Sequence, residues 1–192
     1  MRVIAGTAKG TRLAAVPPGV RPVSDRAREG VFSSLGELVS GAAVLDLFAG
    51  TGAMGIEALS RGAAAAVFVE RSPRAIASIR QNLERTRLAD RARVVRSDVG
   101  RFLAGIGDVE GRFDLVLVDP PFDVGGSDLT VTLDLLAASA ALGEGATVVL
   151  TRDSRSSIDV VPVNWPVAKR LRYGDSVLTL FRPRNLPRTT EV

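Results

Sequence analysis

The sequence predicts an α/β domain in which a mostly parallel sheet carries helices on both faces. From residue 43 onward, short apolar runs alternate with amphipathic stretches, which is typical of βαβ units. The 192 residues fit one domain, since domains usually hold roughly 100 to 200 residues. Apolar residues make up 46% of the chain and charged residues 24%, which is the composition of an ordinary globular protein.

The chain begins with two short apolar runs around a glycine-containing turn, at residues 2–5 and 11–16. The breaker Pro17-Pro18-Gly19 follows the second run. We therefore expect a small N-terminal β-hairpin extension over residues 1–22.

A helix is expected after this extension, with Ser24 or Asp25 as its N-cap and apolar residues at a spacing of about four. Those apolar residues are Ala27, Val31, Leu35 and Leu38. The strands predicted for the parallel sheet are 43–47, 66–69, 92–96, 115–118 and 146–150. The helices predicted between and after them are about 53–61, 73–87, 98–105 and 128–142.

The last strands are predicted at residues 169–173 and 176–182, joined by the tight turn Gly174-Asp175. They form an antiparallel hairpin that brings the expected sheet to seven strands. We therefore expect the main domain to span residues 23–184 and residues 185–192 to form a flexible tail.

The chain contains no cysteine and no histidine. Disulfides, thiolate zinc sites, thiol nucleophiles and imidazole bases are therefore excluded, and we expect no metal. The apolar stretches, such as residues 62–69, are far shorter than the roughly 20 residues of a membrane span. Because the N-terminus also lacks the pattern of a signal peptide, we expect a cytoplasmic protein without membrane contact.

Charge is distributed unevenly along the chain. Residues 1–40 carry six basic and three acidic groups, and residues 152–192 carry eight and four, whereas residues 41–151 carry eleven and fourteen. Basic ends around an acidic centre are consistent with a polyanion held at the periphery. The alternative is a solvated basic surface without a partner.

A glycine-rich turn follows the first strand of the parallel sheet. Gly50, Gly52 and Gly55 match the pattern G-x-G-x-x-G, and Glu70 lies further along the chain at the end of the next strand. This pattern alone is a weak indication of a nucleotide cofactor, because glycines also form tight strand-to-helix turns.

Two carboxylates favour S-adenosylmethionine over a dinucleotide. Asp46 lies in the strand just before the turn, where it would repel a pyrophosphate but could accept an ammonium group. Glu70 could bind both ribose hydroxyls under either cofactor, and Asp98 could accept the adenine amino group or cap the next helix. The candidate cofactor-binding residues are Asp46, Phe48, Gly50, Thr51, Gly52, Glu70, Asp98 and Asp119.

The most specific motif is Asp119-Pro120-Pro121-Phe122, which follows a strand of apolar residues. Consecutive prolines stiffen the backbone, so the acceptor groups of this loop are held in place. The Asp119 carboxylate and the Pro120 carbonyl could accept the two N–H bonds of an exocyclic amine, while Phe122 stacks on an extruded base. We therefore take Asp119, Pro120, Pro121 and Phe122 as candidate catalytic residues; the alternative is a simple turn with Phe122 in the core.

These motifs together resemble the class I amino-methyltransferases. More narrowly, Arg2-Val3-Ile4-Ala5-Gly6, Lys9-Gly10 and the segment from Arg21 to Glu29 resemble the RsmD family of 16S rRNA guanine-N2 methyltransferases. The similarity continues through residues 54–62 and the closing hairpin, although this family typically has Thr at position 23 and Asn at position 33, where this chain has Val23 and Ser33. The resemblance implies a Rossmann-like class I methyltransferase fold.

The resemblance also implies the substrate. A methyl group would be transferred to N2 of one guanine in 16S rRNA, presented in an assembled or partly assembled 30S subunit, by a protein that we expect to be a monomer. Arg26 and Arg28 are then candidates for RNA or cofactor contacts, and Arg2, Lys9 and Arg12 for RNA backbone contacts. The alternative for all five is surface charge.

Three other functions compete with this interpretation. Adenine-N6 methylation of DNA or RNA would use the same Asp119 motif. An NAD-dependent dehydrogenase is disfavoured by Asp46 and by the Asp119 motif. An RNA-binding module without turnover is disfavoured because both motifs are intact.

Overall fold

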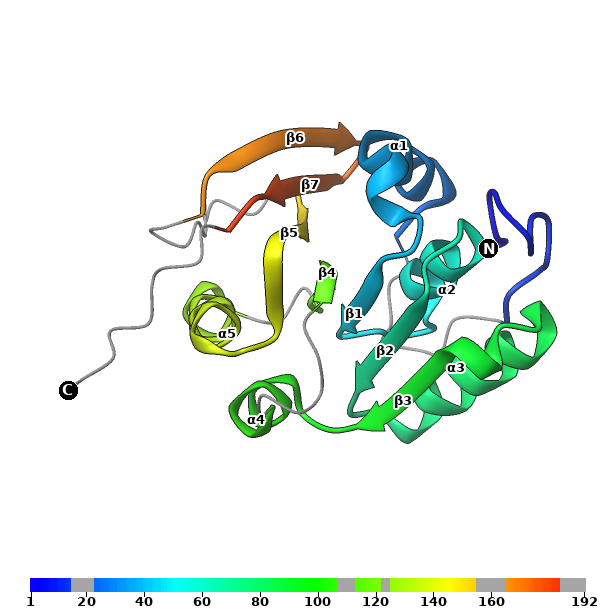
Figure 1. The fold of residues 1–192 in the computed structure, drawn as a ribbon, viewed down its shortest axis with the longest axis horizontal. Coiled ribbons are helices and arrows are strands. Elements are labelled where there is room, and N and C mark those ends of the chain that lie inside the picture. Colours follow the sequence, from blue (N-terminus) through cyan, green and yellow to red (C-terminus); the bar gives the residue numbers. More distant parts are fainter. Residues whose placement is uncertain (15–22, 107–112, 122–124, 155–164, 184–192) are drawn as a thin grey trace.

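The computed structural model of the protein describes residues 1–14, 23–106, 113–121, 125–154 and 165–183. Its strands are β1 (Ala43–Leu47), β2 (Ala65–Glu70), β3 (Ala92–Arg96), β4 (Phe113–Val118), β5 (Leu142–Asp153), β6 (Val167–Tyr173) and β7 (Ser176–Phe181). They form one sheet in the order β3-β2-β1-β4-β5-β7-β6 (Figure 1). The first five strands pair in parallel and β7 is antiparallel to both of its neighbours. This is the mostly parallel seven-stranded sheet, with an antiparallel C-terminal hairpin, that the sequence predicts.

Helices cover both faces of the sheet. They are α1 (Asp25–Leu35), α2 (Ala53–Ser60), α3 (Pro73–Thr86), α4 (Val99–Gly105) and α5 (Gly126–Ala138), with short 3-10 helices η1 (Gly36–Val39) and η2 (Ala89–Arg91). The core accordingly has two parts: α1, α2 and α3 contribute to one, and α4 and α5 to the other. Alternate residues of β4 point to opposite parts, since Leu115 and Leu117 belong to the first and Val116 and Val118 to the second. Every helix among the described residues is too short or too polar to span a membrane.

The last predicted helix ends earlier than expected. The helix α5 stops at Ala138, not near residue 142, because a short turn follows it and the strand β5 already begins at Leu142. The Phe113 N–H donates to the Ala141 carbonyl at 2.7 Å, and Leu142 pairs with Phe113. The first helix is also shorter than its apolar spacing predicts: Leu38 lies in η1 and is 50% exposed.

The expected N-terminal β-hairpin is wrong for the described part of the chain. Residues 1–14 form a single isolated bridge, between Arg2 and Arg12, and no strand. The reason is that three of their backbone donors bond to side chains of α2: Ile4 and Ala5 donate to Glu57 and Ala8 donates to Ser60. A strand ladder would need those same donors.

Residues 1–14 pack onto the main domain. Val3, Ala8 and Leu13 are buried in the core part formed with α1, α2 and α3. The predicted end of the extension at residue 22 and the predicted tail at 185–192 lie outside the described residues, so these boundaries stay predictions.

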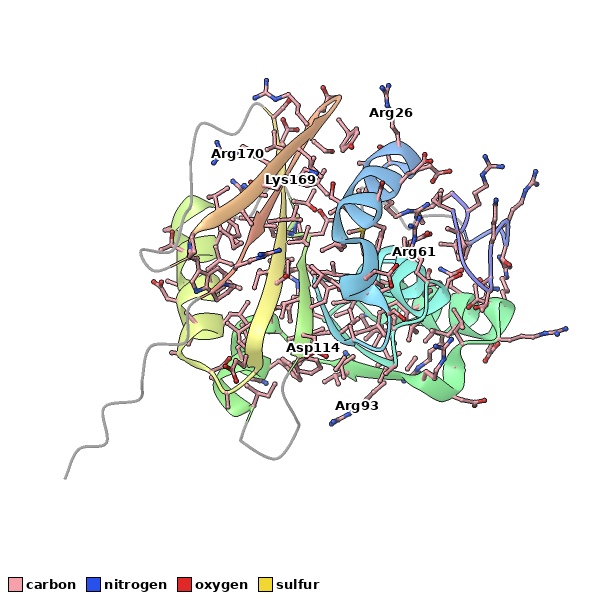
Figure 2. All side chains as sticks on the ribbon, turned by 45° about the horizontal axis from the view of Figure 1, so that its top comes forward. Arg26, Arg61, Arg93, Asp114, Lys169 and Arg170 are labelled. Carbon is pink, nitrogen blue, oxygen red and sulfur yellow. The ribbon has the colours of Figure 1, made fainter. Side chains whose placement is uncertain are left out.

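The C-terminal hairpin packs against α1 (Figure 1). The contact is so close at Gly30 that an added Cβ would lie 1.9 Å from the Tyr173 hydroxyl oxygen. Nearby, Lys169 on β6 donates to the Ser34 hydroxyl at 3.1 Å (Figure 2 labels Lys169). A side chain at position 30 would therefore have to displace the Tyr173 ring.

Candidate functional site

The glycine-rich loop connects β1 to α2 through an unusual backbone. Phe48, Gly50 and Gly52 all have left-handed conformations, with φ of 59°, 56° and 75°. Glycine adopts this conformation freely, whereas a side chain such as that of Phe48 strains it. The Ala49 N–H donates to the Val69 carbonyl at 3.1 Å and the Gly52 N–H to the Ala49 carbonyl at 2.7 Å. The loop therefore folds back over the carboxyl ends of β1 and β2.

Asp46 is a buried carboxylate at the carboxyl end of β1. It is 1% exposed, and its Oδ2 accepts the Gly55 N–H at 2.9 Å. Burial raises its pKa well above the ordinary value, and the negative charges of Asp119 and Glu70 add to this, against the lowering effect of the Gly55 hydrogen bond. A cation at this position would offset both the burial and the repulsion.

Gly55 lets α2 approach Asp46. An added Cβ there would lie 2.4 Å from the Phe68 ring and 3.0 Å from Asp46 Oδ2. Any larger residue would displace either the ring or the carboxylate. The third glycine of the G-x-G-x-x-G pattern therefore serves helix packing.

Glu70 ends β2 and holds the loop from the side. Its Oε2 accepts the Gly50 N–H at 2.9 Å, and its Oε1 accepts the Ser72 N–H at 2.8 Å. The side chain is half-buried, so it remains available from the solvent side. Each carboxylate oxygen has two acceptor positions, which leaves capacity for ligand hydroxyls.

Asp98 caps α4. Its Oδ1 accepts the N–H groups of Gly100 at 3.0 Å and Arg101 at 3.3 Å, and the residue is exposed. The capping role predicted for it is therefore observed. Its role toward an adenine amino group stays a prediction.

Asp119 directly follows β4 and lies next to the carboxyl end of β1. Leu47 pairs with Val118, and the Asp119 N–H lies 3.4 Å from the Leu47 carbonyl oxygen. Asp119 is half-buried, Pro120 is buried and Pro121 is exposed, while Phe122 lies outside the described residues. The sheet order reverses between β1 and β4, which is where open α/β sheets bind ligands.

Three carboxylates thus meet at the ends of three adjacent strands. Glu70, Asp46 and Asp119 follow β2, β1 and β4, and their charges are close enough for two of them to raise the pKa of the third. This set fits a ligand with a cationic group and hydroxyls, and it opposes a pyrophosphate. Among the described residues, no group of acidic side chains is arranged to bind a metal ion.

The basic residues predicted to bind RNA divide into two kinds. Arg2, Lys9, Arg12 and Arg26 are the first kind, and all four are exposed. Figure 2 shows Arg26 pointing away from α1 into solvent. They are placed as an RNA contact requires, although the contact itself stays a prediction.

For Arg28 the structure corrects the prediction of an RNA contact, because this side chain is buried. Its side chain is 0% exposed, and its Nη2 donates to the Arg2 carbonyl at 2.5 Å and to Asp25 at 2.7 Å. Burial lowers its pKa, with Arg61 adding to this and the charges of Asp25 and Glu57 opposing it. The N-terminal residues cover this part of α1, so Arg28 neither reaches RNA in this conformation nor lies on a solvated helix surface.

The residues that hold the N-terminal segment were not predicted from the sequence. Glu57 is buried and accepts Ile4 N–H at 2.8 Å, Ala5 N–H at 3.0 Å and Arg61 Nε at 2.7 Å. The Arg61 guanidinium also lies 5.2 Å from the centroid of the Phe32 ring, between α1 and α2 (Figure 2).

Asn82 was also missed. It is 0% exposed and lies on the apolar face of α3, between Ile79 and Leu83. A polar residue in that position was the available signal, because buried amides need partners. Its partners are the Ala14 N–H and the Thr51 carbonyl.

The chain matches the family model described as conserved hypothetical protein 95 over residues 1–182. It is 36% identical over 184 residues to the ribosomal RNA small subunit methyltransferase D of Escherichia coli strain K12, covering 95% of this chain and 89% of that relative. Among solved structures, the putative methyltransferase yhhF from Escherichia coli has a TM-score of 0.83 at 34% identity, covering 97% of this chain and 99% of that one. A hypothetical protein of Thermus thermophilus has a TM-score of 0.79 at 33% identity, covering 95% and 99%. The similarity therefore spans the N-terminal segment as well as the sheet.

Proposed function

This chain belongs to the RsmD family, whose model is described as conserved hypothetical protein 95, and from that premise we propose that it methylates the exocyclic N2 of a guanine in 16S rRNA. The methyl donor is S-adenosylmethionine. The observation that carries the proposal is the meeting of Asp46, Glu70 and Asp119 at the switch point of the sheet.

The cofactor would be held by the ends of β1 and β2. Asp46 would take its ammonium group, Glu70 its ribose hydroxyls and Asp98 its adenine amino group. The backbone of Phe48, Gly50, Thr51 and Gly52 would line the same region. When bound, S-adenosylmethionine supplies an electrophilic methyl group.

The acceptor would be held by the end of β4. The Asp119 carboxylate and the Pro120 carbonyl accept the two N–H bonds of the guanine amine, which localises the nitrogen lone pair for attack. Pro121 keeps the loop rigid, and Phe122 stacks on the extruded base. Catalysis then comes from positioning and polarisation, without a metal or a covalent enzyme intermediate.

The substrate is proposed to be 16S rRNA in an assembled or partly assembled 30S subunit, in the cytoplasm. The basic side chains of Arg2, Lys9, Arg12 and Arg26 would contact its phosphates. We propose that the protein works as a monomer.

The test is transfer of labelled methyl from S-adenosylmethionine to 30S particles lacking the modification, compared with naked 16S rRNA and with DNA. We expect N2-methylguanosine from the particles after nucleoside analysis. N6-methyladenosine from any substrate would replace the proposal with its alternative, adenine methylation. Cofactor binding without transfer to any substrate would favour a binding module.

A further inference from the structure

We propose that Asn82 is a positioning residue that ties the N-terminal segment, residues 1–14, to the cofactor loop, residues 48–52. Its side chain bonds to both segments at once. Because the cofactor is the ligand considered, this inference rests on the proposed function. The consequence is that binding of S-adenosylmethionine depends on how the N-terminal segment is docked.

The two hydrogen bonds define the orientation of the amide. Asn82 Oδ1 accepts the Ala14 N–H at 2.7 Å, and Asn82 Nδ2 donates to the Thr51 carbonyl at 2.9 Å. Rotating the amide by half a turn would place donor against donor and acceptor against acceptor. The side chain is 0% exposed, so water does not compete for either partner.

Asn82 holds the middle of the cofactor loop. On one side of Thr51, Gly50 is held by Glu70, and on the other side Gly52 donates to the Ala49 carbonyl. Thr51 itself is 3% exposed. The loop also rests on α3, since a Cβ on Gly52 would lie 3.3 Å from Ile79. A shift of Asn82 would therefore move the residue that joins the two left-handed glycines.

The other partner of Asn82 belongs to a segment that is fixed at several points. Leu13 is buried in the core and donates its N–H to the Met1 carbonyl at 3.2 Å. Upstream, Ile4 and Ala5 are fixed by Glu57. Ala14 thus ends a described segment that is fixed at several points. Because Asn82 bonds to both Ala14 and Thr51, a displacement of Ala14 would also displace Thr51.

Such a link acts in both directions. If docking of the N-terminal segment strengthens cofactor binding by some factor, cofactor binding must strengthen docking by the same factor. An RNA held by Arg2, Lys9 or Arg12 would therefore affect the cofactor loop through this contact.

The experiment compares Asn82→Leu, which removes both hydrogen bonds, with Thr86→Val as a matched control. Thr86 lies on the same helix and is buried, but among the described residues its hydroxyl bonds only to the Asn82 and Leu83 carbonyls of its own helix. Affinity for S-adenosylmethionine is measured by titration calorimetry. Amide hydrogen exchange at Ala14 and at residues 50–52 is measured in the protein alone.

We expect Asn82→Leu to weaken cofactor binding by about ten- to a hundredfold relative to Thr86→Val, as for the loss of two buried hydrogen bonds. Exchange should be faster at both Ala14 and residues 50–52. Binding within about twofold of the control, or faster exchange at only one of the two segments, overturns the proposal. If the wild-type protein itself does not bind the cofactor, the proposed function fails, whereas the exchange data still decide whether the link exists.

The variant Asn82→Asp keeps the proposal testable if Asn82→Leu does not fold. An ionised carboxylate can accept the Ala14 N–H but cannot donate to Thr51, whereas a protonated carboxyl can do both. We expect its loss of affinity, relative to wild type at the same pH, to be largest at about pH 9 and to shrink toward about pH 6, since burial raises the pKa of a carboxyl. A pH-independent ratio near one would contradict the role of the donor, because a merely structural effect of the substitution would not follow the protonation of this group.

Discussion

The two ends of α2 each contact an irregular segment, and carboxylates hold both segments in different ways. At the C-terminal end, Glu57 accepts two backbone N–H groups from residues 4 and 5 and is paired with Arg61. At the N-terminal end, Glu70 accepts the Gly50 N–H of the glycine-rich loop and Asp46 accepts the Gly55 N–H of α2, while the two carboxylate charges repel each other.

The difference separates a structural carboxylate from those that we propose to bind the cofactor. Glu57 has a cationic partner, Arg61, and two backbone N–H donors within the chain, so its charge is compensated before any ligand binds. Asp46 instead carries a raised pKa, caused by burial and by neighbouring acids. Carboxylates in that state are typical of sites that await a cationic ligand.

The largest expected effect is on stability, at Glu57. Replacing Glu57 by Leu leaves the Ile4 and Ala5 N–H groups and Arg61 without their acceptor, and we expect the free energy of unfolding to fall by about 3–5 kcal/mol. Urea denaturation measures this. The control is Glu84→Leu at an exposed position of α3, which should change stability by less than about 0.5 kcal/mol. A similar small change for Glu57→Leu would remove the distinction between the two ends.

The next effect is on turnover, at Asp119. We expect Asp119→Ala to lower kcat by about 10²- to 10³-fold, because the acceptor amine loses its polarising partner. Cofactor affinity, measured by calorimetry, should change much less. If Asp46→Ala, Glu70→Ala and Asp119→Ala all weakened cofactor binding equally, the proposed division between cofactor and acceptor residues would be wrong.

A smaller effect is expected at Glu70. The variant Glu70→Ala removes the acceptor of the Gly50 and Ser72 N–H groups, and cofactor affinity should fall by about ten- to a hundredfold. The measurement is a calorimetric titration with S-adenosylmethionine. Asp90→Ala, an exposed acid in η2, serves as the control and should bind as wild type does. Unchanged affinity for Glu70→Ala would show that this carboxylate, like Glu57, only holds the chain.

The smallest effect is on the pH dependence of stability, at Asp46. Its folded-state pKa is raised, so the folded protein holds the proton more tightly than the unfolded chain does. The protonated Asp46 side chain therefore stabilises the folded protein fully below about pH 3.9, the ordinary pKa of Asp. This stabilisation is lost as the pH rises through the folded-state pKa of Asp46. The variant Asp46→Asn does not lose stability in this way as the pH rises. Its melting temperature at about pH 8 should therefore exceed that of wild type, by about 2–4 °C for each kcal/mol regained in the free energy of unfolding.

The Asp46→Asn variant also tests whether the charge of Asp46 contributes to cofactor binding. Asp46→Asn should bind S-adenosylmethionine more weakly, because it offers no charge to the ammonium group. A gain in stability together with a loss of affinity is the expected outcome. If the melting temperatures of wild type and variant differed equally at about pH 5 and about pH 8, Asp46 would not titrate in that range.

Local patterns were sufficient for most of the fold. The strands β1 and β3 have the predicted bounds, because short apolar runs between amphipathic stretches are set by burial in a parallel sheet. The N-terminal hairpin failed for the opposite reason. Three of its backbone donors are satisfied by Glu57 and Ser60, more than fifty residues away, and no local pattern encodes such a contact.

The residues of the candidate site also divide into those that local sequence patterns predict and those whose position depends on distant contacts. Asp46, Glu70 and Asp119 were predictable because each lies at the end of an apolar strand, and parallel strands end at one edge of the sheet. Arg28 was misjudged, since an arginine in a charged segment is usually exposed. Its burial comes from the N-terminal residues that cover α1, which only the folded chain reveals.

The close contact between Gly30 and Tyr173 has a consequence for how the protein is made. The two elements that meet there, α1 and β6, are synthesised far apart in time, since Ser34 and Lys169 are separated by 135 positions along the chain. While the chain emerges from the ribosome, α1 can pack on the early strands but cannot contact β6 until that strand has been synthesised. The final docking of the N-terminal helix is therefore a late folding event, and a prematurely terminated chain would expose the surface of α1 that Tyr173 normally covers.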